Sequence, residues 1–226
     1  MDEINIEVNG TKDFTTDTDS FGNIVINGSI IEAHNEFIVE IKGKVTTGLD
    51  IFEEEDHNTI SSNIFKYQTD YTSAGSSIID FNNKLKISEN TPYNVALEIM
   101  HRLYDYLNYI KGSTDINTTA EKAMENKCGV CQDYAHIMLS LLRLRNISAR
   151  YTVGMFVGEG ETHAWVEVLS NGKWYGFDPT NNLLIDNNYI KISSGRDATD
   201  CSVNKGIFRG FASQLQTASL SVNHQQ

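Results

Sequence analysis

The chain has 226 residues, of which 40% are hydrophobic and 10% aromatic, and 30 acidic against 18 basic residues give a formal net charge of −12. This composition supports a packed core and argues against intrinsic disorder, while the acidic balance argues against nucleic acid or an anionic membrane as a partner. The negative charge favours solubility first, and attraction of basic substrates second.

Three cysteines, Cys128, Cys131 and Cys201, are too few for a disulfide scaffold and point to a reducing compartment. The N-terminus lacks the basic start and apolar run of a signal peptide, and no stretch approaches the roughly 18 apolar residues of a membrane span. We therefore expect a cytoplasmic protein, or a secreted or periplasmic one if a leader has been removed. The sequence does not indicate an oligomeric state.

The chain divides into a predicted N-terminal β-module over residues 1–46, a connector over 47–90 and a larger unit over 91–226. In the module, residues 21–23 predict a turn, Asn27-Gly28 is a hairpin signal, and residues 37–45 alternate as a half-buried strand does. In the connector we expect one or two short helices, and the acidic cluster at 53–57 is typical of a solvated loop.

The larger unit begins with helical patterns. Thr91-Pro92 predicts a helix start, followed at helical spacing by Ile99, Leu103, Tyr106, Leu107 and Ile110. Residues 118–121 predict a capping box for a short helix that ends at Asn126. A further helix is expected from Cys131 to a stop near Asn146.

After Asn146 the period changes to two, which predicts strands over 150–157, 163–169 and 173–177, with Asn171-Gly172 as a tight hairpin turn. Helices followed by an antiparallel meander indicate an α+β domain in which helices pack on a sheet. The tail holds one more possible strand, at 218–222.

Cys131 lies where a glycine-containing loop enters the predicted helix. A thiol in the first helical turn faces unpaired backbone N–H groups and the positive end of the helix dipole, and both favour the thiolate. Cys131 is therefore a candidate nucleophile.

The predicted hairpin supplies its partners. If Asn171 and Gly172 form the turn, Ser170 pairs with Lys173, which places His163 and Asp178 diagonally on one face, within side-chain reach. Cysteine, histidine and aspartate are the parts of a thiol acyl-transfer site. Here Cys131 attacks a carbonyl carbon, His163 moves protons and Asp178 orients His163.

The backbone N–H of Cys131 is the expected first oxyanion donor. Gln132 and Tyr109 are candidates for the second donor, and Trp165 is expected to pack beside the site. Cys128 and Cys131 also form a Cys-x-x-Cys pair, which keeps a redox function open.

A zinc site using Cys128, Cys131 and either His136 or His163 is a further alternative, although a second ligand pair is missing. His101 and His136 are expected to have structural roles, and Asp133 to cap the Cys131 helix. The sequence lacks a calcium-loop signature, so we expect no metal, no cofactor and calcium independence.

Four motifs together resemble the transglutaminase-like superfamily, closest to its bacterial, cysteine-protease-like branch, over about residues 90–210. They are Gly-Val-Cys-Gln-Asp-Tyr-Ala-His at 129–136, Ile-Ser-Ala-Arg-Tyr at 147–151, His-Ala-Trp-Val-Glu at 163–167 and Phe-Asp-Pro-Thr at 177–180. Gly195-Arg196-Asp197 and the stretch 206–210 extend the resemblance into the tail, and residues 19–45 are similar to a shortened form of that branch's N-terminal β region.

The resemblance implies a papain-like α+β core in which Cys131, His163 and Asp178 form a catalytic triad. It makes residues 91–226 the catalytic domain and a peptide or protein amide the substrate. We expect a cysteine peptidase or amidase. A cross-linking transglutaminase and a non-catalytic binding module remain the alternatives, because the superfamily contains both.

Overall fold

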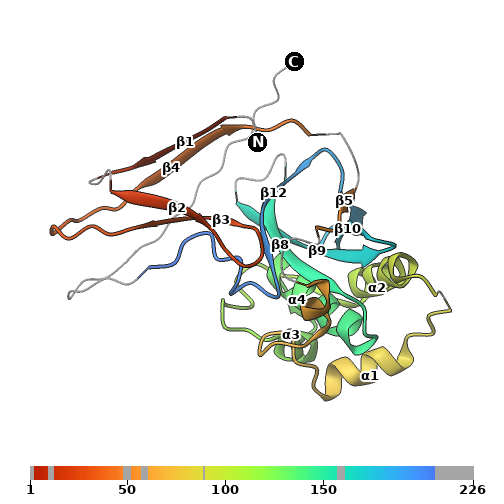
Figure 1. Ribbon diagram of the computed structural model, residues 1–226. Coiled ribbons are helices and arrows are strands. Elements are labelled where there is room, and N and C mark those ends of the chain that lie inside the picture. Colours follow the sequence, from red (N-terminus) through yellow and green to blue (C-terminus); the bar gives the residue numbers. More distant parts are fainter. Residues whose placement is uncertain are drawn as a thin grey trace.

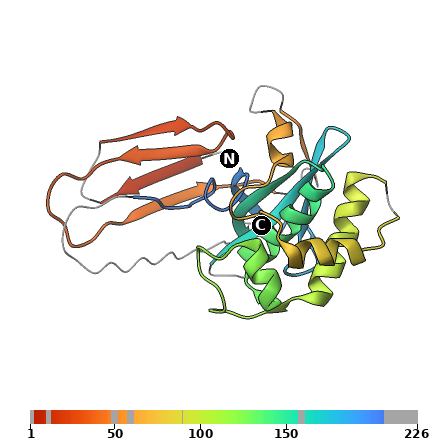
Figure 2. The same ribbon diagram turned by 90° about the horizontal axis from the view of Figure 1, so that it is seen from below.

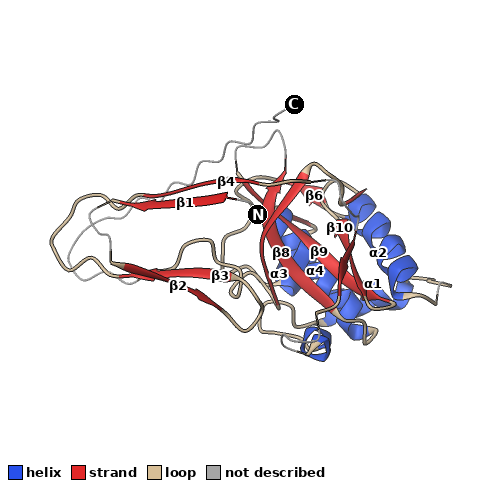
Figure 3. Ribbon diagram, turned by 45° about the horizontal axis from the view of Figure 1, so that its top comes forward, coloured by secondary structure: helices blue, strands red, loops and turns tan. Residues whose placement is uncertain are grey.

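A computed structural model describes residues 3–9, 13–47, 52–56, 61–88, 90–156 and 161–206. It confirms the expected α+β class: helices pack on one side of a curved antiparallel sheet, and N-terminal strand pairs extend away from them (Figures 1 and 3). Among the described helices, none is long and apolar enough to cross a membrane.

The central sheet is antiparallel throughout, with its strands in the order β11-β10-β9-β8-β12 and β5 added beside β10. These strands are β5 (Phe52–Glu54), β8 (Ala149–Phe156), β9 (Thr162–Ser170), β10 (Lys173–Asp178), β11 (Leu183–Leu184) and β12 (Tyr189–Gly195). The predicted meander is β8 to β10, and the sequence pattern missed β5, β11 and β12.

The hairpin that joins β9 to β10 has the predicted geometry. Asn171 and Gly172 both have positive φ, 54° and 75°, as a two-residue turn of this kind requires. Ser170 pairs with Lys173, which confirms the expected register.

The helical layer lies against this sheet and contributes most of the core. Its elements are η1 (Ser62–Lys66), α1 (Ser76–Lys84), α2 (Pro92–Tyr106), α3 (Ala120–Asn126) and α4 (Cys131–Leu144). The fully buried side chains of α4 include Met138, Leu141 and Leu142, and they pack against Ala164, Val166 and Val168 of β9 within one cluster. Parts of the connector join the core as well, since Phe65 and Ile78 are buried.

Helix α2 starts as predicted, because the Thr91 hydroxyl accepts a hydrogen bond from the Asn94 N–H at 3.3 Å. It ends at Tyr106, so the expectation that Ile110 belongs to its buried stripe is wrong. The chain leaves the helix at Leu107 with extended backbone and enters the short strand β6 (Asn108–Tyr109). Ile110 follows this strand and is 49% exposed.

The capping box predicted at residues 118–121 is also wrong, although α3 ends at Asn126 as expected. Thr119 caps α3, and the Glu121 carboxylate accepts the backbone N–H groups of Gly75, Ser77 and Ile78 at the start of α1. Those groups lack intrahelical partners and the N-cap residue Gly75 has no side chain, so a carboxylate from the neighbouring helix replaces the missing cap.

Two antiparallel ribbons form the N-terminal part, and they project from the core as an arm (Figure 2). The ribbons are β1 (Glu3–Val8) with β4 (Val39–Lys44), and β2 (Phe14–Thr18) with β3 (Ile24–Gly28). The strand expected at 37–45 is present as β4, but all of its residues are exposed rather than half-buried. Among the described strands β4 pairs with β1 alone, and its residues form no buried cluster in that part of the chain.

Asn27 and Gly28 do not form the expected turn; they lie inside β3, opposite Thr15 and Phe14. The reversal occurs over residues 19–23, which confirms the turn predicted at 21–23. The Asp19 carboxylate accepts the N–H groups of Phe21 and Asn23 at 2.8 and 2.9 Å. This side-chain turn, with Gly22 at a φ of 86°, decides the register of the ribbon.

Residues 53 and 54 of the acidic cluster at 53–57 belong to strand β5, where a loop was expected. Glu53 of β5 accepts hydrogen bonds from Arg150 and Lys191, which also bind the buried Glu167. Burial alone would raise the pKa of Glu167, but the charges of Lys191 and Arg150 outweigh it and lower the pKa to about 2. Residue 57 lies outside the described residues.

We predict that Glu167→Gln destabilises the fold at neutral pH by about 3 kcal/mol, as measured by urea denaturation. Because the folded-state pKa of Glu167 lies below its unfolded value, this stabilisation is present above pH 4.5 and is lost as pH falls toward 2. The difference in unfolding free energy between wild type and Glu167→Gln should therefore shrink as pH falls from 4.5 toward 2. Glu54→Gln on β5, where the side chain is 72% exposed and pairs with Lys173, is the control, with an expected change under about 0.5 kcal/mol. An equal loss in both variants would contradict the assignment.

Candidate active site

Cys131 is the first residue of α4 and is half-buried. The turn before it is held by Asp133, whose carboxylate accepts the Val130 N–H at 2.8 Å and the Thr114 hydroxyl at 2.6 Å. This confirms the predicted capping role of Asp133. Gly129 is required at this turn, because a Cβ there would lie 2.5 Å from the Asp133 side chain. The sequence thus fixes the thiol at the end of the helix where anions are favoured.

His163 lies near the start of β9, and Asp178 ends β10. Their side chains meet across the hairpin: His163 Nε2 lies 2.7 Å from Asp178 Oδ2. His163 is 3% exposed and Asp178 is fully buried, so little water competes for this contact. The predicted diagonal pair is therefore present in the folded chain.

The electrostatics connect His163 to Cys131 as well. Burial alone would lower the pKa of His163, but hydrogen bonds to Asp178 and Cys131 and the charges of both groups raise it to about 10. Since Nε2 faces Asp178, Nδ1 is the nitrogen left for the thiol. The arrangement favours a charged imidazolium on His163 at neutral pH.

Asp178 has more partners than the sequence predicted. Its Oδ2 also accepts the Tyr189 hydroxyl at 2.8 Å and the Asn181 amide at 2.8 Å, while its Oδ1 accepts the N–H groups of Thr180 and Asn181. Burial would raise the pKa of Asp178, but these hydrogen bonds and His163 lower it. Neither Asn181 nor Tyr189 was identified from the sequence. The Pro-Thr-Asn-Asn stretch at 179–182 is a turn signal that could have pointed to Asn181, whereas Tyr189 had no such signal.

Aromatic rings surround His163. Trp165 is stacked with it at 6.5 Å between ring centroids, and Phe156 and Tyr189 lie at 6.1 and 6.2 Å. Trp165 is 1% exposed, so it packs behind His163 and leaves no face for a substrate. These rings limit the orientations that the imidazole can take.

The two candidates for the second oxyanion donor both lie near Cys131 in the fold. Gln132 is in the first turn of α4, and Tyr109 lies on β6, whose partner is β7 (Cys128–Gly129) just before Cys131. Tyr109 is 47% exposed, so its side chain is open to solvent.

The remaining candidates have structural surroundings. His136 is buried between Tyr71 and Tyr151 and accepts the Ala198 N–H through Nε2, and burial lowers its pKa to about 4. His101 is exposed on α2 and contacts Asn182. Among the described residues, no group of three or more His, Cys, Asp or Glu side chains is placed to hold a metal ion.

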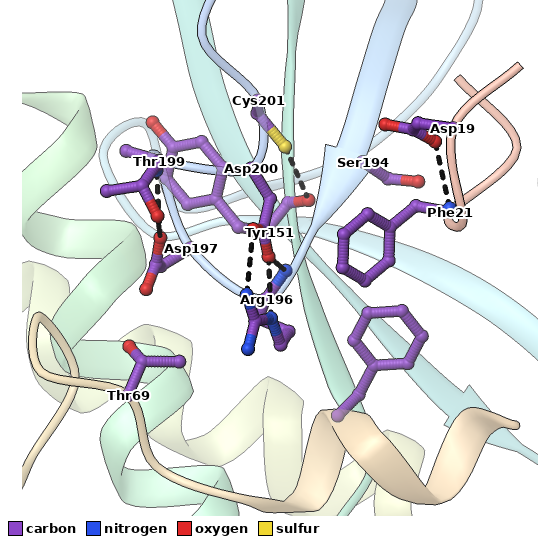
Figure 4. Close-up of polar contacts among 12 residues, drawn as sticks. Asp19, Phe21, Thr69, Tyr151, Ser194, Arg196, Asp197, Thr199, Asp200 and Cys201 are labelled. Carbon is purple, nitrogen blue, oxygen red and sulfur yellow. Dashed lines mark hydrogen bonds and ion pairs between the residues drawn. The ribbon is translucent and has the colours of Figure 1, made fainter. Parts of the chain in front are cut away.

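Cys128, Cys131 and Cys201 are all free thiols, and Cys201 is buried in the loop that follows β12. Figure 4 shows the loop around it, where Arg196 pairs with Asp200 and Asp197 accepts from Thr199. The Gly195-Arg196-Asp197 motif therefore closes its own loop and does not enter the site. Residues 207–210 of the second tail motif, and the strand expected at 218–222, lie outside the described residues.

Comparisons with known proteins bear on the family and the fold. Residues 79–179 match the family model of the transglutaminase-like superfamily. An uncharacterized protein of Mycobacterium leprae is 40% identical over 114 residues, which are 46% of this chain and 40% of that protein. An uncharacterized protein of Mycobacterium bovis is 33% identical over 129 residues, 50% of this chain and 41% of that protein. The chain thus spans about two fifths of the length of these relatives.

A crystal structure of a candidate cysteine protease from Cytophaga hutchinsonii has the same fold, with a TM-score of 0.64 at 24% identity, over 89% of this chain and 72% of that one. The helices and the antiparallel sheet described above form the transglutaminase-like, papain-like core. The family likeness is thus shown for residues 79–179, which form a transglutaminase-like domain.

Proposed function

We propose that the protein is a thiol-dependent amide hydrolase, a cysteine peptidase or amidase, with Cys131, His163 and Asp178 as its catalytic triad. The observation that carries the proposal is the position of His163, which is bound to Asp178 through Nε2 and coupled to Cys131 on its other side. A buried imidazole with a carboxylate on one nitrogen and a helix-start thiol on the other is suited to proton transfer during acyl transfer.

The reaction follows from these positions. The Cys131 thiolate attacks the carbonyl carbon of an amide, and the imidazolium of His163 donates its Nδ1 proton to the leaving amine as the C–N bond breaks. His163 then takes a proton from water, whose oxygen attacks the acyl-enzyme and releases the acid and the thiolate. Asp178 holds the ring and stabilises its charged form.

The developing oxyanion is bound by the backbone N–H of Cys131, which points out of the start of α4, with Gln132 or Tyr109 as the second donor. The scheme uses no cofactor or metal. We assign it to the catalytic domain predicted at residues 91–226, whose sheet and core also include β5 and α1, acting on peptide or protein amides in the cytoplasm.

Hydrolysis is favoured over cross-linking because water is always available as the acceptor, whereas cross-linking needs a bound amine and exclusion of water. The same site would release the acyl group to an amine if one were bound, so both outcomes share the first half-reaction.

The thiolate–imidazolium pair predicts selective alkylation. Iodoacetamide at neutral pH should modify Cys131 far faster than Cys128 or the buried Cys201, as followed by intact and peptide mass spectrometry. His163→Gln should slow the reaction of Cys131 and leave that of Cys128 unchanged. Equal, slow reaction of all three thiols would contradict the proposal.

The decisive test is activity against a peptide and amide library, with and without a primary amine. Wild-type protein should release amine from some members, and Cys131→Ala should lower the rate more than about a thousandfold. Cys128→Ala is the matched control and should retain activity. Incorporation of the added amine would assign cross-linking instead, and binding without turnover would assign a non-catalytic module.

We also predict that EGTA or EDTA leaves the rate of hydrolysis unchanged, because the scheme moves protons and acyl groups between side chains alone. Rates before and after chelation, and after adding back calcium or zinc, check this. A rate restored only by metal would contradict the mechanism.

A further inference from the structure

Tyr189 is the first residue of β12, and its hydroxyl donates to the oxygen of Asp178 that also receives His163. We infer that Tyr189, together with Asn181, is a positioning residue of the proposed triad, and that it sets both the orientation and the charge of the carboxylate that His163 uses. The inference rests on the proposed function in one respect, namely that His163 is the acid–base group.

The contacts on Asp178 divide between its two oxygens. Oδ1 accepts the backbone N–H groups of Thr180 and Asn181, at 2.9 and 3.2 Å. These two residues follow β10, so the hydrogen bonds hold the carboxylate against the turn directly after it. Oδ2 receives three side-chain donors, His163 at 2.7 Å and Tyr189 and Asn181 at 2.8 Å each. Asp178 Oδ2 has two lone pairs but three hydrogen-bond donors, so its negative charge is divided among them and His163 is one partner of three.

This sharing has a chemical consequence. A carboxylate whose only hydrogen-bond donor is an imidazole stabilises the imidazolium strongly. Transfer of the imidazolium proton to the leaving amine of the substrate is then less favourable. The hydroxyl and the amide weaken that stabilisation, so His163 can give up its proton during each turnover. Tyr189 and Asn181 also prevent the carboxylate from rotating away when the ring is neutral.

Burial and two aromatic contacts hold the ring of Tyr189 in place. It is 6% exposed, and its ring contacts Trp165 edge-on at 5.5 Å between centroids and Phe156 at 4.7 Å. The same rings flank His163, so the phenol hydroxyl and the imidazole are held by one aromatic cluster. Burial and the charge of Asp178 raise the pKa of Tyr189, so it remains a neutral donor.

The test compares Tyr189→Phe with Tyr175→Phe, because each removes one hydroxyl and keeps the ring. Tyr175 lies on β10, where its ring contacts Phe52 and Tyr93 rather than the site. Two readouts are taken for wild type and both variants: the rate of Cys131 alkylation by iodoacetamide from pH 5 to 11, and the pH dependence of kcat on an amide substrate. Thermal unfolding is measured in parallel.

In wild type, the rate of Cys131 alkylation should rise a second time with increasing pH, as the imidazolium of His163 loses its proton. Tyr189→Phe should move that rise upward by about half a pH unit, since His163 then faces a carboxylate with one donor fewer, and should lower kcat about tenfold with little change in KM. Tyr175→Phe should match wild type in both. Asn181→Ala, in the turn after β10, should shift the alkylation profile in the same direction. It keeps the inference testable if Tyr189→Phe fails to fold.

An unchanged alkylation profile in both Tyr189→Phe and Asn181→Ala would overturn the inference, whatever their thermal stability, because a residue that only packs would change stability alone. The failure of the proposed function looks different: no amide is hydrolysed by any form, while the profile of Cys131 alkylation still shifts in Tyr189→Phe.

Discussion

The pairing of β9 with β10 decides which side chains share a face of the sheet, and the site depends on it. Asn171 and Gly172 turn the chain in two residues, so Ser170 meets Lys173 and His163 is brought to Asp178. A slip of one residue would turn His163 to the other face, among the side chains that pack against the helices. The left-handed backbone of two adjacent residues thus fixes the relation between acid and base at the far end of the hairpin.

A second constraint is the cost of a fully buried carboxylate. Asp178 is stable as an anion because it has five hydrogen-bond donors, and its charge in turn permits a positive imidazole in a place shielded from water. The same principle operates at Glu167, further along β9, where Arg150 and Lys191 supply the charge. One strand therefore carries two separate buried ion pairs.

The features that the sequence predicted are those encoded over a few residues. The start of α2 at Thr91, the cap of α4 at Asp133 and the β9–β10 register all arise from neighbours in the chain. Glu53 and Glu121 were misread because their partners are distant in sequence. Tyr189 could not be found for a related reason: it reaches Asp178 through the pairing of β12 with β8, and a bulge between Lys191 and Ser193 interrupts the alternation that would reveal a strand.

The turn at Asp19–Asn23 touches the core at the outermost strand of the sheet, β12. The Asn23 amide donates to the Ser194 carbonyl and accepts the Ser194 N–H, both at 2.8 Å, as a neighbouring strand would. Phe21 packs on Phe65 beside this contact. Exposed strand edges are where chains add to one another and aggregate. The side chain of Asn23 in the N-terminal arm therefore occupies backbone hydrogen-bonding groups at the edge of β12, the strand that begins with Tyr189.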